Sequence, residues 1–167
     1  AYSGHRTCRK NLTLMNPYTP HNFSSLLGIK GLSDTLLSNH FALYEGYVKN
    51  VNTLQELLST KALGTPEYAE LKRRFAWEWN GMRLHELYFE NLSREENIAG
   101  PETSLKDMLA ASFGTFEAWE EEFFGIALMR GIGWVVLSRD KSTGQLFNTW
   151  INEHDGGHLA GNTPLLV

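Results

Sequence analysis

The sequence predicts an α+β protein: an N-terminal antiparallel helical hairpin followed by a C-terminal α/β domain with a short antiparallel sheet, incomplete at the C-terminus. Apolar residues recur at helical spacing in two long stretches, which Gly64, Thr65 and Pro66 separate. Beyond Gly133 the pattern changes to short runs rich in β-branched and aromatic residues. We therefore expect a helical hairpin domain over residues 18–98 and a partial α/β domain over residues 99–167.

The segment before the hairpin is expected to be a flexible tail over residues 1–17 that continues as an extended lead-in. The opening run AYSGHRTCRKNLTL is basic and polar without an acidic residue, and no apolar run follows it, which excludes a secretory signal. Two other interpretations stay open: an organellar transit peptide, and sequence upstream of a natural start at Met15.

The first long helix is predicted to begin after Ser33, which is a suitable N-cap. Gly64 ends that helix, Thr65 caps the second, and Pro66 takes the first position of a helix that runs to about Leu92. Together the two helices form an antiparallel hairpin. One stripe of the first helix is predicted to carry Leu36, His40, Tyr44, Tyr47 and Val51.

The second half of the chain is predicted to hold two shorter helices and a β-hairpin. Ser104 and Asp107 fit a capping box at the start of a helix through Ser112. Gly114-Thr115 then begins a helix over FEAWEEEFFGIALMR. The runs WVVLSRD and QLFNTWI, separated by KSTG, predict two paired strands.

Composition excludes several classes of function. The net charge of −4 is unlike that of nucleic-acid-binding proteins, which are more often basic, and it gives no overall attraction for an anionic substrate. No apolar run approaches the roughly 20 residues needed to cross a bilayer. The single cysteine, Cys8, excludes an internal disulfide and fits a reducing compartment. We therefore expect a cytoplasmic protein, with a mitochondrial location less favoured.

His40 and His85 are candidate metal ligands because they lie on the two different long helices. Taken alone, each is more often a packed histidine than a ligand. Gly81 lies one turn before His85, and a glycine inside a helix costs about 1 kcal/mol relative to alanine, while it leaves room beside the imidazole. The loop INEHDGGH adds His154, Asp155 and His158, which by themselves are typical of an ordinary loop. No local zinc motif and no G-x-S-x-G motif is present.

An ordered series of motifs resembles the iron/manganese superoxide dismutase family over roughly residues 18–167. LSDTLLSNH is similar to the start of the family's first helix, YVKNVN to the end of that helix, and FAWEWNGMRLHELYFENL to the segment with the second metal ligand. FGTFEAWEEEF, GIGWVVL and TPLLV follow in the family's order. One match would carry little weight, but the whole series identifies the chain as a member of this family.

The resemblance implies that His40 and His85 are the first two ligands of one iron or manganese ion, and His154 favours iron. Tyr47 would gate the substrate channel, His154 would hydrogen-bond the metal-bound solvent, and Trp134 would line the pocket. The implied activity is the disproportionation of superoxide to O₂ and H₂O₂ by a homodimer or homotetramer. The resemblance also implies that a side chain from the strand region, His154, fills the space beside the glycine on the second helix.

Two departures from the family pattern shape these expectations. One residue fewer than usual separates the first ligand from Tyr47, so an alignment from Ser33 places that ligand at His40, whereas an alignment back from Tyr47 places it at Asn39. We choose His40 because asparagine is a poor ligand for such a site. The family's third and fourth ligands, an Asp and a His, would lie just beyond Val167.

We therefore expect a C-terminally truncated form of a superoxide dismutase, with only part of the metal site present in this chain. The alternative is a non-catalytic protein that uses the dismutase fold for a structural or assembly role. The presence of His40, Tyr47, His85 and Trp134 argues against that alternative.

Overall fold

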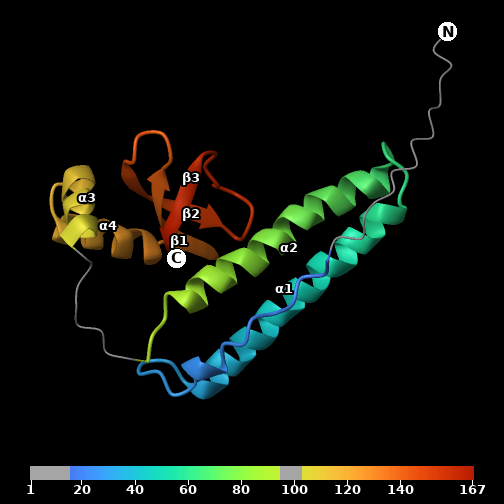
Figure 1. Ribbon diagram of the computed structural model, residues 1–167, viewed down its shortest axis with the longest axis horizontal. Coiled ribbons are helices and arrows are strands. Elements are labelled where there is room, and N and C mark those ends of the chain that lie inside the picture. Colours follow the sequence, from blue (N-terminus) through green and yellow to red (C-terminus); the bar gives the residue numbers. More distant parts are fainter. Residues whose placement is uncertain (1–15, 95–102) are drawn as a thin grey trace, which may run out of the picture.

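The computed structural model describes residues 16–94 and 103–167. Two long antiparallel helices, α1 (Asp34–Thr60) and α2 (Pro66–Glu90), lie side by side, and a small sheet with two shorter helices lies on the α2 side of this pair (Figure 1). This arrangement confirms the predicted α+β fold class. Of the predicted tail, only residues 16 and 17 are described, and the predicted domain boundary at 98–99 lies outside the described residues. The other elements are η1 (Ser24–Leu26), α3 (Thr103–Phe113), α4 (Phe116–Ala127), β1 (Gly133–Asp140), β2 (Leu146–Asn152) and β3 (Asn162–Leu166).

The helix ends follow local capping chemistry. The Ser33 hydroxyl accepts a hydrogen bond from the backbone N–H of Leu36, and Thr65 does the same for α2, with Pro66 in its first turn. Thr115 caps α4 in the same way. The predicted caps at Ser33 and Thr65 are confirmed, whereas the predicted cap at Ser104 is wrong because α3 already begins one residue earlier.

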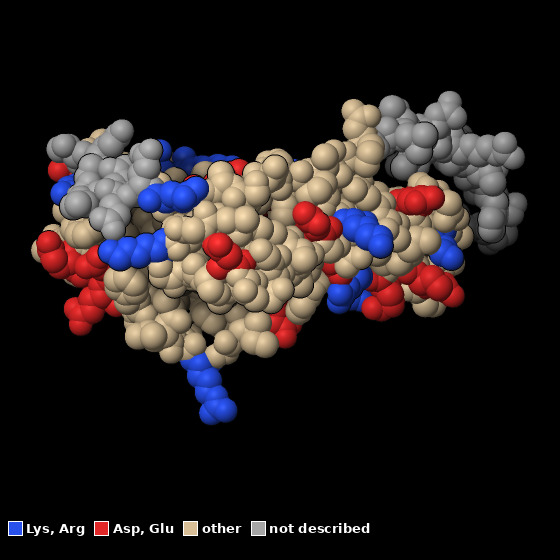
Figure 2. All heavy atoms as spheres, turned by 90° about the horizontal axis from the view of Figure 1, so that it is seen from below, with Lys and Arg blue, Asp and Glu red and all other residues tan. Residues whose placement is uncertain are grey.

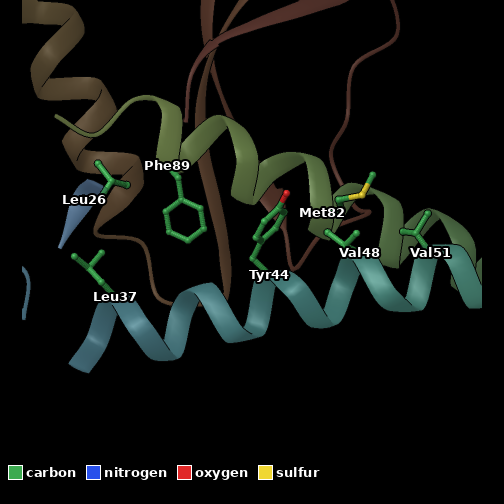
Figure 3. Packing of buried hydrophobic residues seen from close by; sticks show 7 residues of the cluster. All are labelled: Leu26, Leu37, Tyr44, Val48, Val51, Met82 and Phe89. Carbon is green, nitrogen blue, oxygen red and sulfur yellow. The ribbon is translucent and has the colours of Figure 1, made fainter. Parts of the chain in front are cut away.

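The hairpin core lies between α1 and α2 and is closed at one end by Leu26 of η1 (Figure 3). The predicted stripe was wrong at Leu36, which is 48% exposed, while its neighbour Leu37 is fully buried. The buried face of α1 is centred one residue later than predicted, so His40 and Tyr47 lie at its edge, half-buried. The buried side chains of this cluster are Leu26, Leu37, Tyr44, Val48, Val51, Met82 and Phe89.

The three strands form an antiparallel sheet in the order β2-β1-β3. The predicted hairpin of β1 and β2 is confirmed, but β3 was not predicted. Alternation along the central strand sends neighbouring side chains to opposite faces. Leu137 packs in a cluster with Leu109 of α3 and Trp119 of α4, whereas Val136 packs in a cluster with Leu84 of α2. The sheet is therefore held between the hairpin and the two short helices.

Charged side chains of both signs are interspersed on the face of the molecule shown in Figure 2. Arg73 and Glu70 form an exposed ion pair on α2, at 2.6 Å. Within the described residues, no helix combines the length and apolar character that crossing a membrane requires.

Candidate metal centre

The structure brings His40 and His85 together across the interface of α1 and α2. Their ring centroids are 4.8 Å apart and the rings meet edge to face, at 80°. His85 is 1% exposed and His40 is half-buried, whereas Asn39 is exposed. The geometry therefore pairs His85 with His40, the histidine chosen from the sequence, and leaves Asn39 outside the centre.

The backbone of α2 fixes the proton of the His85 ring. Its Nδ1 lies 2.6 Å from the carbonyl oxygen of Gly81, and because a carbonyl only accepts, Nδ1 must carry the hydrogen. The lone pair of the neutral ring is then on Nε2, where it is available to a metal. This use of one ring nitrogen to orient the other is typical of metal-binding histidines.

Burial keeps both imidazoles neutral at ordinary pH. Burial, with a smaller effect of the neighbouring His40 and His154 rings, lowers the pKa of His85 to about 4, although the hydrogen bond to Gly81 partly opposes this shift. Burial also lowers the pKa of His40. A metal binds the neutral form of histidine, so the electrostatics of the pair suit a ligand role.

The donor set fits part of an iron or manganese site. Imidazole nitrogen is a ligand that suits iron, and the centroids of the two rings lie 4.8 Å apart. In the ranges 16–94 and 103–167, no group of three or more His, Cys, Asp or Glu side chains could hold a metal ion. Within the described residues, His40 and His85 are therefore two candidate ligands of such a site.

A hydrogen-bonded chain of three side chains borders the histidine pair. The Tyr47 hydroxyl oxygen lies 2.7 Å from Nε2 of His154, and the Trp134 indole N–H donates to Nδ1 of His154 at 3.1 Å. The Tyr47 and Trp134 rings lie 5.1 and 4.9 Å from the His85 ring, respectively. The structure therefore brings all of the predicted site side chains into one cluster.

The loop after β2 sets the position of His154. Glu153 has a left-handed backbone conformation, with φ +54°, a strained geometry that is often found at functional sites. The His158 ring Nε2 donates to the carbonyl oxygen of His154 at 2.8 Å, which stabilises the loop between these two residues. His158 itself and Asp155 are exposed, so of the polar residues in this predicted loop only His154 enters the cluster.

The space beside Gly81 is filled differently from the prediction. A Cβ atom at this position would lie 2.7 Å from two ring carbons of Tyr47, which are among the nearest atoms. The side chain that needs the glycine is therefore Tyr47 from α1, and His154 lies beyond it, at the hydroxyl end. The reason is that α1 and α2 pack closely here, so the tyrosine ring lies directly against the backbone of α2 and leaves no space there for a loop residue.

Sequence reasoning missed Trp77 and Glu78, which extend the cluster along α2. The Trp77 ring lies 5.1 Å from that of His154, and the Arg74 guanidinium lies over Trp77 at 5.4 Å. Trp77, Gly81 and His85 recur every four residues on one face of the helix, a spacing that could have revealed Trp77.

Glu78 is a buried carboxylate, 2% exposed, that joins the two long helices. It accepts a hydrogen bond of 3.0 Å from the Asn50 side chain of α1 and pairs with Arg74 at 2.5 Å. Burial raises the pKa of Tyr47, and the charge of Glu78 raises it further while that of Arg74 lowers it. Tyr47 is therefore held in its protonated form.

Comparison with known proteins relates the chain to one family. Residues 101–167 match the sequence profile of the iron/manganese superoxide dismutases, C-terminal domain. The chain is 36% identical over 145 residues to superoxide dismutase [Fe] of Cupriavidus metallidurans, covering 83% of this chain and 72% of that protein. It is 33% identical over 139 residues to superoxide dismutase [Mn] 2 of Haloferax volcanii, covering 81% and 69%. For superoxide dismutase [Fe] of Aquifex pyrophilus, the identity is 31% over 148 residues, covering 83% and 68%.

Proposed function

Because the chain belongs to the iron/manganese superoxide dismutase family, we propose that it converts superoxide to O₂ and H₂O₂ at one iron or manganese ion. The observation that supports this most directly is the distance of 4.8 Å between the ring centroids of His40 and His85. Because Nδ1 of His85 donates to the Gly81 carbonyl, the lone pair of this ring is on Nε2. These two imidazoles would hold the ion. When bound, the ion would supply the one-electron redox chemistry of the reaction.

The residues around the histidine pair have roles that suit this reaction. Tyr47 keeps its phenol proton because burial raises its pKa, so it can hold a proton beside the place where superoxide is reduced. The rings of Tyr88 and Trp134 pack against those of His40 and His85, respectively, and His85 is almost fully shielded from water. Superoxide is a small anion and the chain has a net charge of −4, so attraction must come from local groups and not from the molecule as a whole.

Replacement of either histidine tests the proposal. The protein is produced as its gene encodes it, and bound iron and manganese and the rate of superoxide dismutation are measured. His40→Ala and His85→Ala are each expected to lower metal affinity and activity by about 100-fold or more, since loss of an outer-shell partner alone typically costs about 10–100-fold.

His21→Ala is the matched control, because His21 is a half-exposed histidine whose ring faces Glu90 on the surface. It is expected to keep metal and activity. A folded wild-type protein that binds neither metal and shows no dismutation would overturn the proposal and favour a structural role for the dismutase fold.

We propose iron as the working metal, on the basis of the histidine at position 154; the relatives are named for iron and for manganese. The protein is loaded with each metal in turn, and the activity per bound ion is compared. Higher activity with iron is expected, and higher activity with manganese would contradict the assignment.

We further propose a homodimer or homotetramer in the cytoplasm. The family resemblance supports the oligomer and the single cysteine, Cys8, supports the reducing compartment. Light scattering of the purified protein and cell fractionation test the two parts, and a monomer or an organellar protein would contradict them.

A further inference from the structure

A second buried hydrogen-bonded network joins α1 to α2, and the proposed reaction does not use it. The Tyr44 hydroxyl of α1 donates to Oε1 of Glu86 on α2 at 2.9 Å and accepts from the backbone N–H of His21 at 3.0 Å. The Arg83 guanidinium donates to the other oxygen of Glu86. Tyr44 and Glu86 are 1% and 6% exposed, so solvent offers little replacement for these bonds.

The Tyr44 hydroxyl joins three segments of the chain. A phenol hydroxyl has one hydrogen to donate and lone pairs with which to accept, and here both capacities are used. The hydrogen is directed to the carboxylate of Glu86, and a lone pair accepts the N–H of the lead-in before α1. Figure 3 shows the ring between the two long helices, with its oxygen towards α2. Tyr44 therefore fixes α1 to α2 and the lead-in to both.

This network lies next to the histidine pair. Tyr44 follows His40 by one turn of α1, and Glu86 directly follows His85 in α2. The Phe89 ring lies between the two groups, with its centroid 6.1 Å from that of Tyr44 and 5.0 Å from that of His40. Neighbouring residues of a helix share one hydrogen-bonded backbone, so a displacement of α2 at Glu86 also displaces His85.

We propose that Tyr44 is a positioning residue: through its bonds to Glu86 and to the lead-in, it sets the distance and angle at which His85 meets His40. Without the hydroxyl, the Glu86 oxygen and the His21 N–H each lose a partner in a buried place. A buried polar group without a partner costs more than a satisfied one contributes, so both groups must move to find other partners. The effect on a bound metal rests on the proposed function, whereas the effect on the two rings does not.

A separate attachment of the lead-in provides a control for simple loss of packing. The backbone N–H and C=O of Tyr18 exchange hydrogen bonds of 2.8 and 2.9 Å with the side chain of Asn52. Asn52 lies twelve residues after His40, more than three turns further along α1. Removal of this attachment should weaken the hold on the lead-in without moving the histidine rings.

The test compares the full chain without metal as wild type and as Tyr44→Phe, which keeps the ring and removes only the hydroxyl. The ring ¹H and ¹³C signals of the histidines are recorded by NMR well above their ordinary pKa of about 6.5. His40→Gln and His85→Gln assign the two rings by the loss of their signals. Each ring alters the magnetic shielding of the other at 4.8 Å, so these signals report the distance and angle between them. Tyr44→Phe is expected to shift the signals of both rings.

Two variants are expected to leave these signals unchanged. Tyr68→Phe removes a phenol hydroxyl from the first turn of α2, where the ring faces Lys72. Asn52→Ala removes the other attachment of the lead-in and is expected to lower stability only. If Tyr44→Phe does not fold, Glu86→Gln tests the same bond from α2, because it offers one acceptor oxygen to two donors, and a smaller shift of the same signals is expected.

Manganese(II) alone then probes the centre, with its dissociation constant measured from the electron paramagnetic resonance signal of the free ion. Tyr44→Phe is expected to bind it about 10-fold more weakly, the lower end of the loss that outer-shell partners produce, and Tyr68→Phe as tightly as wild type. Wild-type ring signals in folded Tyr44→Phe, or in Glu86→Gln where Tyr44→Phe does not fold, would overturn the proposal. An unchanged affinity in a protein that binds manganese would overturn it too. Shifted signals in a chain that binds no manganese would support the positioning of the rings and count against the proposed function only.

Discussion

Among single residues, Glu78 stabilises the packing of α1 against α2 next to the candidate metal centre. Its carboxylate is buried between the two long helices, one turn before the glycine that contacts Tyr47, and each of its oxygens has a partner, Asn50 or Arg74. A buried polar group left without a partner costs more than a satisfied one contributes. The carboxylate therefore couples the position of α1 to that of α2 near the cluster.

Glu78→Ala is expected to lower the free energy of unfolding by about 2 kcal/mol, because Asn50 loses its acceptor and a buried space is left. Urea denaturation of the metal-free protein measures the change. Glu70→Ala is the control: it removes a carboxylate from the same helix that pairs with Arg73 but is 71% exposed, so no measurable change in stability is expected. Equal effects of the two substitutions would show that Glu78 has no special role.

The residues of the centre were predictable to different degrees. Helical spacing placed His40 and His85 on separate helices, but only the ordered family motifs favoured ligands over packed histidines. The burial of Glu78 was not predictable, because it depends on Asn50 from the other helix and a charged side chain is usually exposed. The occupant of the space at Gly81 depends likewise on the distance between two helices, which no local pattern contains.

At the scale of elements, the close contact of α1 with α2 sets the geometry of the centre. At Gly81 the two helices pack closely, since the Tyr47 ring occupies the place of its missing side chain. Gly46 also lies inside a long helix, one residue before that tyrosine, but a Cβ there would meet nothing within 4 Å. The two glycines therefore separate the effect of packing from that of helix propensity.

Gly81→Ala is expected to destabilise the protein by about 1–3 kcal/mol, because Tyr47 must move from its packed position. Gly46→Ala is expected to stabilise it by up to about 1 kcal/mol, the ordinary gain of alanine over glycine in a helix. Thermal and urea unfolding of both variants provide the measurement. Stabilisation by both substitutions would mean that the tyrosine ring adapts freely and that Gly81 is not required for packing.

Elements with local signals were predicted well, and an element without them was not. Ser33, Thr65 and Thr115 cap their helices through their own side chains, which is chemistry readable from a few neighbouring residues. The strand β3 is short and contains Pro164. It follows the loop that carries His154 and pairs with β1, which is more distant in the sequence than β2. Its formation depends on that long-range pairing, and proline is tolerated there because β3 lies at the edge of the sheet.

For the whole molecule, the centre exists only when the hairpin and the sheet are assembled. Its side chains come from α1, α2, β1 and the loop after β2. The burial that lowers the pKa of His85 to about 4 is produced by this assembly, and it is absent in the unfolded chain. The global stability of the metal-free protein must therefore depend on pH through this histidine.

The direction follows from proton uptake. Below the unfolded pKa of about 6.5, His85 is protonated in the unfolded chain, whereas in the folded state it stays neutral down to about pH 4. Acid therefore favours unfolding. Stability is present above the unfolded value and falls as the pH drops towards the folded one; between pH 7 and 5 the expected loss is about 2 kcal/mol. The pKa values of His40 and His154 are also lowered by burial and add in the same direction.

Urea unfolding of the metal-free protein measures this loss between pH 7 and pH 5, a range whose lower end still lies above the ordinary glutamate pKa of about 4.3, so that carboxylates contribute less than the histidines. His85→Gln removes the titrating group and is expected to lessen the pH dependence, whatever its effect on stability at neutral pH. The bound metal should steepen the dependence in the unmodified protein, because it requires neutral imidazoles. A stability that is constant over the range, or a variant that keeps the full pH dependence, would show that His85 is not the group that couples folding to acid.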